Sequence, residues 1–295
     1  MRSLPVRVVW IIFGVVLVAT IATYWRLPAG GTYQFDDSGP SGAVSRSITY
    51  LNFPVAIAAV GMLLAVGRSR WAVLAGALCL VAFWPGVSSD DHLTARWINL
   101  PAAVGAVLAV IVTWQGPSGR PAPRGRRDPS PGMVSVARPG TVRVLALGVL
   151  AAWAVPWIVA AIGFYGNDLP IVGRLIRAAQ PTPGEPALAS VHRGLHEGLF
   201  GLQLAATALL VSLYRPLRRP ARAYLAGLLV YGVAISAADG WNEQVVKRGA
   251  ASFQLPNVLY PALSWPWAGV LVLAAVVYVS WSWQERRSPR SPVGT

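Results

Sequence analysis

Apolar stretches about as long as a bilayer-crossing helix recur along the whole chain. A hydrocarbon layer of about 30 Å requires about 20 apolar residues in an α-helix, so each stretch predicts one spanning helix. The pattern predicts an all-α, polytopic integral membrane protein with about eight transmembrane helices. The expected spans are Val8–Tyr24, Ile48–Val66, Trp71–Val87, Ile98–Trp114, Val144–Tyr165, Leu195–Tyr214, Tyr224–Ala238 and Trp267–Trp283.

The composition excludes an ordinary soluble domain. Of the 295 residues, 55% are hydrophobic and 12% are charged, whereas about a quarter of the residues in a soluble domain are charged. The mean hydropathy is +0.51. The single cysteine, Cys79, lies in the third expected span, which excludes an intramolecular disulfide and a cysteine-based metal site.

The basic residues that give the net charge of +14 are unevenly distributed along the chain. Seventeen of the 25 basic residues and only two of the 11 acidic residues fall in alternate connections between spans. Because Lys and Arg accumulate on the cytoplasmic side, these connections and both termini are predicted to be cytoplasmic. The richness in Ala, Gly, Pro and Arg suggests a bacterial chain, and therefore the plasma (inner) membrane. The basic segments predicted to be cytoplasmic are 1–7, 68–70, 115–143, 215–222 and 285–295.

This basic cytoplasmic rim predicts the partners of the protein. Anionic lipid headgroups of the bilayer are the natural partners of such a rim. Nucleic acid is not expected, because no stretch interleaves aromatic and basic residues in a recognition motif.

Residues 115–143 divide the chain into two parts. They contain six prolines, five glycines and six arginines, a composition that predicts a flexible cytoplasmic linker. The expected organisation is a first four-helix membrane unit over 1–114, the linker, a second four-helix unit over 144–284, and a disordered cytoplasmic tail over 285–295.

The two units show a weak internal repeat. With an offset of 147, residues 44–68 align without gaps to 191–215, and seven of the 25 positions are identical. Among the matches are Phe53 with Phe200 and Arg68 with Arg215. Since four spans return the chain to its starting side, a duplication predicts a parallel 4+4 repeat.

The histidines suggest a site near the outer end of the sixth span. His192 and His196 are four residues apart, which places them on one face of a helix that begins near Pro186. Glu197 lies on an adjoining face, and His92 is a secondary candidate.

Two acidic residues at the end of the seventh span complete this candidate site. Asp239 and Glu243 have the same four-residue spacing and lie at the same expected level as the histidines. Antiparallel neighbouring helices would bring the two pairs together. His192, His196, Asp239 and Glu243 could then bind a divalent metal such as zinc, iron or manganese. Together with Glu197, the same residues could instead act in acid–base catalysis.

Three hypotheses for the function follow. The first is a metal-binding or acid–base envelope enzyme that acts on a lipid-linked or amphiphilic substrate. The second is a transporter of a lipid or an uncharged solute, since the expected spans carry almost no charge near their middles. The third is a non-catalytic scaffold or assembly partner, which needs only helix surfaces and the basic cytoplasmic rim, with the polar residues lying at helix ends and pairing with neighbouring basic residues.

Overall fold

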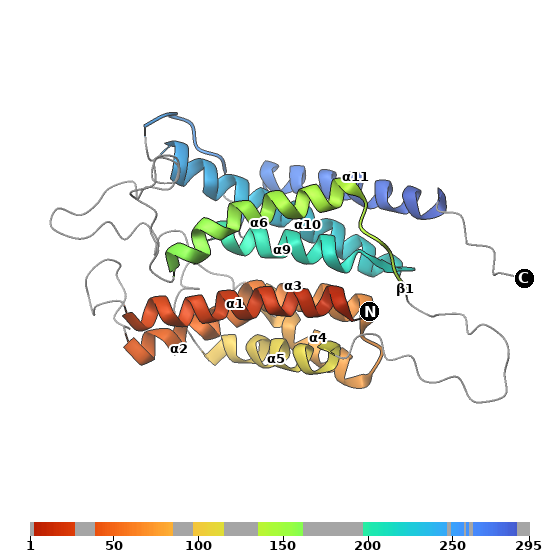
Figure 1. The fold of residues 1–295 in the computed structure, drawn as a ribbon, viewed down its shortest axis with the longest axis horizontal. Helices are drawn as coiled ribbons and strands as arrows, with labels where there is room; N and C mark the ends of the chain where they lie inside the picture. Colours follow the sequence, from red (N-terminus) through yellow and green to blue (C-terminus); the bar gives the residue numbers. More distant parts are fainter. Residues whose placement is uncertain are drawn as a thin grey trace, which may run out of the picture.

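The described residues of the computed structural model are mostly helical, and the helices have roughly parallel axes and form two layers (Figure 1). The structure describes residues 3–26, 39–84, 97–114, 135–161, 197–246, 249–256, 258–259 and 262–287. One layer holds the described helices before residue 115, and the other holds those after residue 140 (Figure 1).

The first layer contains α1 to α5 with three short helical turns, η1 to η3. The second contains α6 and α9 to α11 with the turn η4, and two short strands precede α6 and α10. The bounds of the first layer are α1 (Leu4–Arg26), α2 (Gly39–Tyr50), η1 (Leu51–Val55), α3 (Ala56–Val66), α4 (Arg70–Leu80), η2 (Val81–Phe83), η3 (Trp97–Asn99) and α5 (Leu100–Trp114). Those of the second are β1 (Ser135–Val136), α6 (Thr141–Ala161), α9 (Glu197–Val211), β2 (Tyr214–Arg215), α10 (Arg219–Trp241), η4 (Asn242–Val246) and α11 (Trp265–Arg287).

Within the described residues, five helices are long and apolar enough to cross a membrane. They are Leu4–Ala22, Gly39–Val66, Trp97–Trp114, Arg219–Trp241 and Trp265–Arg287. Three shorter apolar helices accompany them, namely Arg70–Phe83, Thr141–Val155 and Gly198–Val211. The structure therefore agrees with a helical protein suited to a membrane, while the count of eight spans and the repeat stay predictions.

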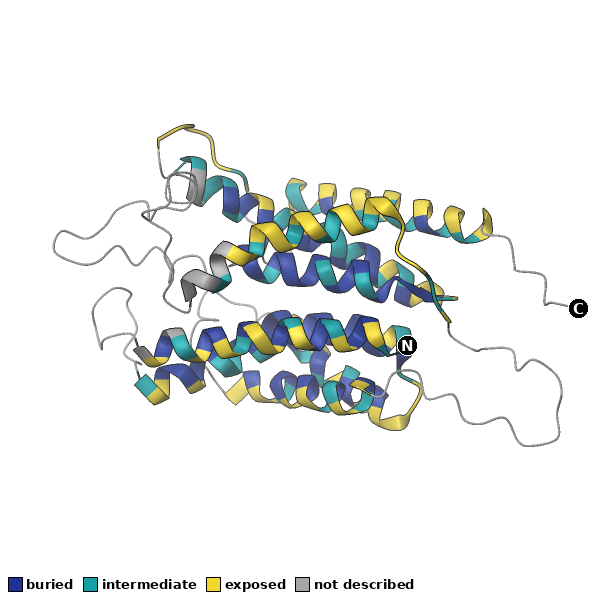
Figure 2. Ribbon diagram, in the orientation of Figure 1, coloured by how far each residue is buried: buried dark blue, intermediate teal, exposed yellow. Residues whose placement is uncertain are grey.

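The outer surfaces of α6 and α11 are strongly apolar. Leu145 on α6 and Val272 on α11 are each 63% exposed, and exposed residues run along both helices (Figure 2). Helices with apolar side chains on all faces need an apolar environment, which lipid provides and water does not.

The helices α2, η1 and α3 form one continuous rod, Gly39–Val66, which is the second helical rod of the chain. It begins nine residues earlier than the hydropathy predicts, at Gly39 instead of Ile48. Its polar residues are accommodated inside the bundle. The Ser47 hydroxyl donates to the Ala43 carbonyl at 2.7 Å. The Arg46 guanidinium is buried and lies 5.0 Å from the centroid of the Tyr24 ring. A cation held over an aromatic face is stabilised electrostatically, which allows the helix to carry this charge inward.

A π-helical turn, η1, joins α2 and α3 without breaking the rod. The turn contains Pro54, which has no backbone N–H to donate to the preceding turn. The N–H of Ala56 instead reaches the carbonyl of Leu51, five residues back. Asn52, which lies within this turn, is buried.

Several contacts gather at one end of the bundle, called here the Glu285 end. Arg7 Nε donates to the Trp114 carbonyl at 3.1 Å, and Arg215 Nη1 donates to Glu285 Oε1 at 3.1 Å. β1 pairs antiparallel with β2, opposing Ser135 to Arg215. The described parts of the arginine-rich connections therefore lie at a common end. The opposite end, the Asp239 end, carries the start of α9 and the end of α10.

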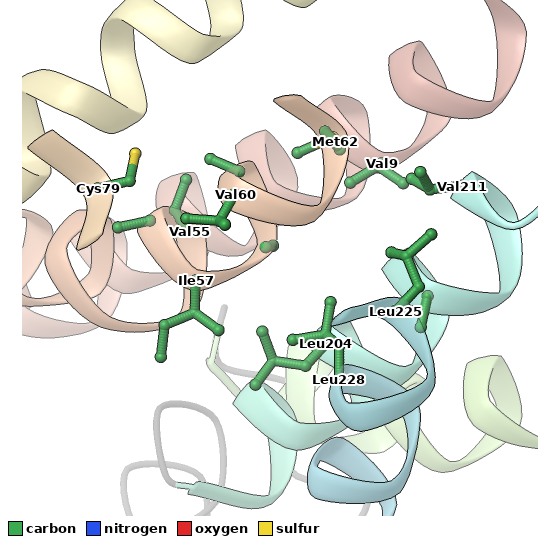
Figure 3. Close-up of a cluster of buried hydrophobic side chains, with 14 of the residues drawn as sticks. Val9, Val55, Ile57, Val60, Met62, Cys79, Leu204, Val211, Leu225 and Leu228 are labelled. Carbon is green, nitrogen blue, oxygen red and sulfur yellow. The ribbon is translucent and has the colours of Figure 1, made fainter. Parts of the chain in front are cut away.

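One hydrophobic core joins the two layers. It lies where α3 packs against α9 and α10, so both halves of the chain contribute to it (Figure 3). The labelled residues of this core are Val9, Val55, Ile57, Val60, Met62 and Cys79 from the first layer and Leu204, Val211, Leu225 and Leu228 from the second.

Candidate polar site at the ends of α9 and α10

Two glycines set the close packing of α9 against α10. A Cβ atom on Gly232 would collide with the Gly201 carbonyl oxygen, and one on Gly201 would collide with the Gly232 carbonyl oxygen. The backbones therefore approach one another as only side-chain-free positions allow. This antiparallel crossing brings the beginning of α9 to the end of α10.

Gly198 is held on both sides by α10. Its N–H donates to Asp239 Oδ2 at 3.1 Å. Its carbonyl oxygen accepts a hydrogen bond from Ser236 Oγ at 2.9 Å, and this hydroxyl also lies 2.9 Å from its own helix's Gly232 carbonyl. The first N–H groups of a helix have no partner within the helix, and a carboxylate there is also favoured by the helix dipole. Asp239 therefore caps α9 from a neighbouring helix.

The structure brings together the elements that carry the predicted site. Asp239 contacts Gly198, which is two residues beyond His196 in sequence. His192 and His196 themselves lie outside the described residues. Glu197 is the first residue of α9 and Glu243 lies within η4, but the described part of the structure does not extend to their side chains.

The metal hypothesis is not tested by these contacts. Among the described residues, no group of three or more His, Cys, Asp or Glu side chains could hold a metal ion. The side chains of three of the four predicted ligands lie outside the described part of the structure, namely those of His192, His196 and Glu243. A carboxylate such as Asp239 offers about four acceptor positions, so a helix cap and a cation can share it.

A further polar contact orders the segment that follows α10. The Asn242 side chain makes two hydrogen bonds with Leu255, from Nδ2 to the carbonyl oxygen and from the Leu255 N–H to Oδ1, both 2.9 Å long. Trp241 Nε1 donates to the Phe253 carbonyl at 2.9 Å. This segment therefore folds over the Asp239 end, beside the candidate site. Neither Asn242 nor Ser236 is predictable from the sequence as a contact residue, since one asparagine or serine in a helix carries no specific signal.

A second polar group lies between the two layers, near the middle of the rods. Gln203 Nε2 donates to Tyr50 Oη at 2.6 Å, and Tyr50 Oη donates to the Phe13 carbonyl at 3.2 Å. All three residues come from different helices, α9, α2 and α1. The oxygens Gln203 Oε1 and Asn52 Oδ1 are buried and have no hydrogen-bond partner among the described residues. This group links the halves of the chain through polar contacts in an apolar interior.

The Glu285 end has its own ionic contacts. Glu285 Oε2 pairs with Arg222, and Oε1 accepts hydrogen bonds from Arg215 and from the Leu217 N–H at 3.3 Å. Burial lowers the pKa of the Arg215 guanidinium from its ordinary value. The pairing fixes the last turn of α11 to the start of α10.

Comparison with protein-family models, with curated proteins and with solved structures found no match. The function is therefore inferred from the residues of this chain alone.

Proposed function

We propose that the chain is an inner-membrane protein with eight spanning helices and both termini in the cytoplasm. The five long apolar helices and the three shorter ones each overlap one of the eight spans that hydropathy predicts. The Glu285 end would face the cytoplasm, because the arginine-rich connections meet there and positive charge is retained on that side. The Asp239 end would then face the periplasm.

The proposal includes a duplication of a four-span unit. Phe53 and Phe200 are equivalent in the offset of 147, and their rings meet edge-on with centroids 6.2 Å apart. In a two-fold arrangement, equivalent residues meet each other where the axis passes. The rod containing α2 and α3 also runs in the same direction as α9, from the Asp239 end to the Glu285 end. Both features support a parallel repeat.

The proposed activity belongs to the Asp239 end. We infer a metal-binding or acid–base envelope enzyme that acts on a lipid-linked or amphiphilic substrate, with His192, His196, Asp239 and Glu243 as ligands or proton carriers and Glu197 beside them. The observation that carries this proposal is the hydrogen bond from the Gly198 N–H to Asp239 Oδ2. It supports a meeting of the α9 and α10 ends, which the shared site requires.

A scaffold role is the second candidate, and the same hydrogen bond favours it. A carboxylate that caps a neighbouring helix has a structural purpose without any chemistry. The two roles differ in what His196 does, because a cap needs Asp239 alone.

Metal analysis of the purified full-length chain tests the proposal. Protein prepared with zinc, iron and manganese available is compared with His192→Ala, His196→Ala and Asp239→Asn. Glu285→Gln is the control, since it removes one carboxylate at the opposite end of the bundle. We expect stoichiometric metal in the parent and control proteins and its loss in the three site variants.

Growth complementation separates acid–base chemistry from a scaffold if no metal is found. Cells lacking the gene would be supplied with the histidine variants or with Asp239→Asn and Glu243→Gln. An enzyme requires these side chains even when the folded protein accumulates normally. Full complementation by every variant, with no bound metal, would contradict the proposed activity.

A further inference from the structure

An apolar groove lies on a different face of α10 from the polar site. Its volume is about 190 Å³, and it is formed where both layers of the bundle meet. It is lined by Phe53, Ile57, Phe83, Tyr224, Tyr231 and Trp267, from η1, α3, η2, α10 and α11. An apolar cavity of about 150 Å³ already stays dry and accepts a benzene-sized group. The groove is therefore large enough for a hydrocarbon segment.

The hydroxyl groups of the two tyrosines in the lining already donate to backbone oxygens and are not available to a ligand in the groove. Tyr224 Oη donates to the Ile57 carbonyl at 2.8 Å, and Tyr231 Oη donates to the Leu259 carbonyl at 2.7 Å. These bonds cross from α10 to neighbouring segments, so they also hold the walls of the groove in place. With the hydroxyl protons committed to backbone oxygens, the tyrosine rings present apolar surface. A ligand that needs hydrogen bonds would lose them on entry.

The groove opens onto the apolar outside of the bundle. Leu271 on α11 lines it and is 64% exposed, and Phe83 is 40% exposed. The opening is thus continuous with the apolar face of α11, most of whose residues are not buried. In a bilayer that face is covered by lipid chains, which can enter the groove sideways without crossing water.

We propose that this groove binds one hydrocarbon chain of a bilayer phospholipid. The proposal rests on the membrane location proposed above, but it does not depend on any chemistry at His196 or Asp239. Phe83, at the end of η2, and Trp267, in the first turn of α11, lie toward the Asp239 end, while Tyr224 lies deeper along α10. The chain would enter with its headgroup toward the Asp239 end. The lipid therefore comes from the leaflet on that side.

A larger side chain at Gly227 would fill the groove without displacing a helix. It lines the cavity, and a Cβ atom built on it meets nothing within 4 Å. Gly227→Leu therefore places a side chain where the lipid chain would lie without colliding with a helix. Gly269→Leu is the matched control, because Gly269 is also open around its Cβ position but lies outside the lining on exposed α11.

Native mass spectrometry of the detergent-purified full-length chain measures the retained lipid. We expect a bound phospholipid on the parent protein and on Gly269→Leu, and at least about a tenfold lower occupancy on Gly227→Leu, because leucine displaces several methylene groups. The bound mass distinguishes a phospholipid from a free fatty acid, and a fatty acid alone would overturn the proposal.

Ala274→Leu on α11 fills the same groove from its opposite wall and keeps the test decisive if Gly227→Leu does not fold. Equal phospholipid occupancy in the parent and in a folded groove variant would overturn the proposal. Equal loss in the control would do so as well. Since no site residue is changed, metal content and complementation remain independent of this outcome.

Discussion

At the scale of single residues, Gly198 makes the polar contacts that join α9 to α10 at the Asp239 end of the molecule. Its N–H and its carbonyl oxygen are both bound by α10, through Asp239 and Ser236. Ser236 and Asp239 are three residues apart and so lie on one face of that helix. This face is directed at α9, whereas the groove tyrosines take a different face of the same helix.

The cap predicts a measurable loss of stability. Asp239→Ala removes the acceptor for the Gly198 N–H and should lower the free energy of unfolding by about 1 to 2 kcal/mol. Asp239→Asn keeps an acceptor oxygen but loses its charge near the helix N-terminus, so a smaller loss, about 0.3 to 1 kcal/mol, is expected.

Thermal unfolding in detergent provides the measurement for this series. Ser280→Ala, at an exposed serine of α11, serves as the control for a polar side chain removed from a helix surface. Identical transition temperatures for Asp239→Ala and the control would show that the cap adds nothing to stability.

At the scale of helices, the contrast between two glycines predicts opposite effects of one substitution. Gly232→Ala forces a Cβ into α9, where Ala205 N would lie 2.7 Å away, and should destabilise the protein by about 1 to 3 kcal/mol. Gly148→Ala on α6 meets nothing within 4 Å and should stabilise it by up to about 1 kcal/mol. Thermal unfolding of both variants checks the signs, and a shift in the same direction would contradict the assigned packing.

The hydrogen bond between Tyr50 and Gln203 predicts coupling between the two layers. A double-mutant cycle with Tyr50→Phe and Gln203→Leu should give an interaction energy of about 0.6 kcal/mol, with about 1.7 kcal/mol as the upper end for such bonds. Reversible unfolding in mixed detergent would supply the four free energies. Strictly additive effects would mean that this bond does not link the layers.

Helix positions were largely predictable because each rod is a continuous apolar run. The start of the second rod was not, since Ser45, Arg46 and Ser47 look like a connection in sequence, and the burial of Ser45 and Arg46 depends on contacts with other helices. For the candidate site, the level of the α9 and α10 ends was estimated from helix rise, and their approach was predicted because the two helices were expected to be antiparallel neighbours. The partner of Asp239 did not, because a backbone N–H has no sequence signature.

At the scale of the whole molecule, the proposed topology can be read out with single cysteines. Cys79 is buried, and Cys79→Ala provides a background without thiols. Gly140 lies at the Glu285 end and Ser252 at the Asp239 end, and both are exposed. A membrane-impermeant maleimide should label Ser252→Cys on intact cells, and Gly140→Cys only after permeabilisation. The reverse pattern would place the arginine-rich end outside.

The pairing of β1 with β2 has a consequence for the continuity of the backbone. Ala137 N–H donates to the Leu213 carbonyl at 2.8 Å, so the segment that enters α6 is fastened within its own half. Nothing in that fastening requires a covalent connection to α5. A protease that cut the chain between residues 115 and 134 would therefore yield two fragments that stay associated, because α1 and α3 of the first fragment still pack against helices of the second, including α9.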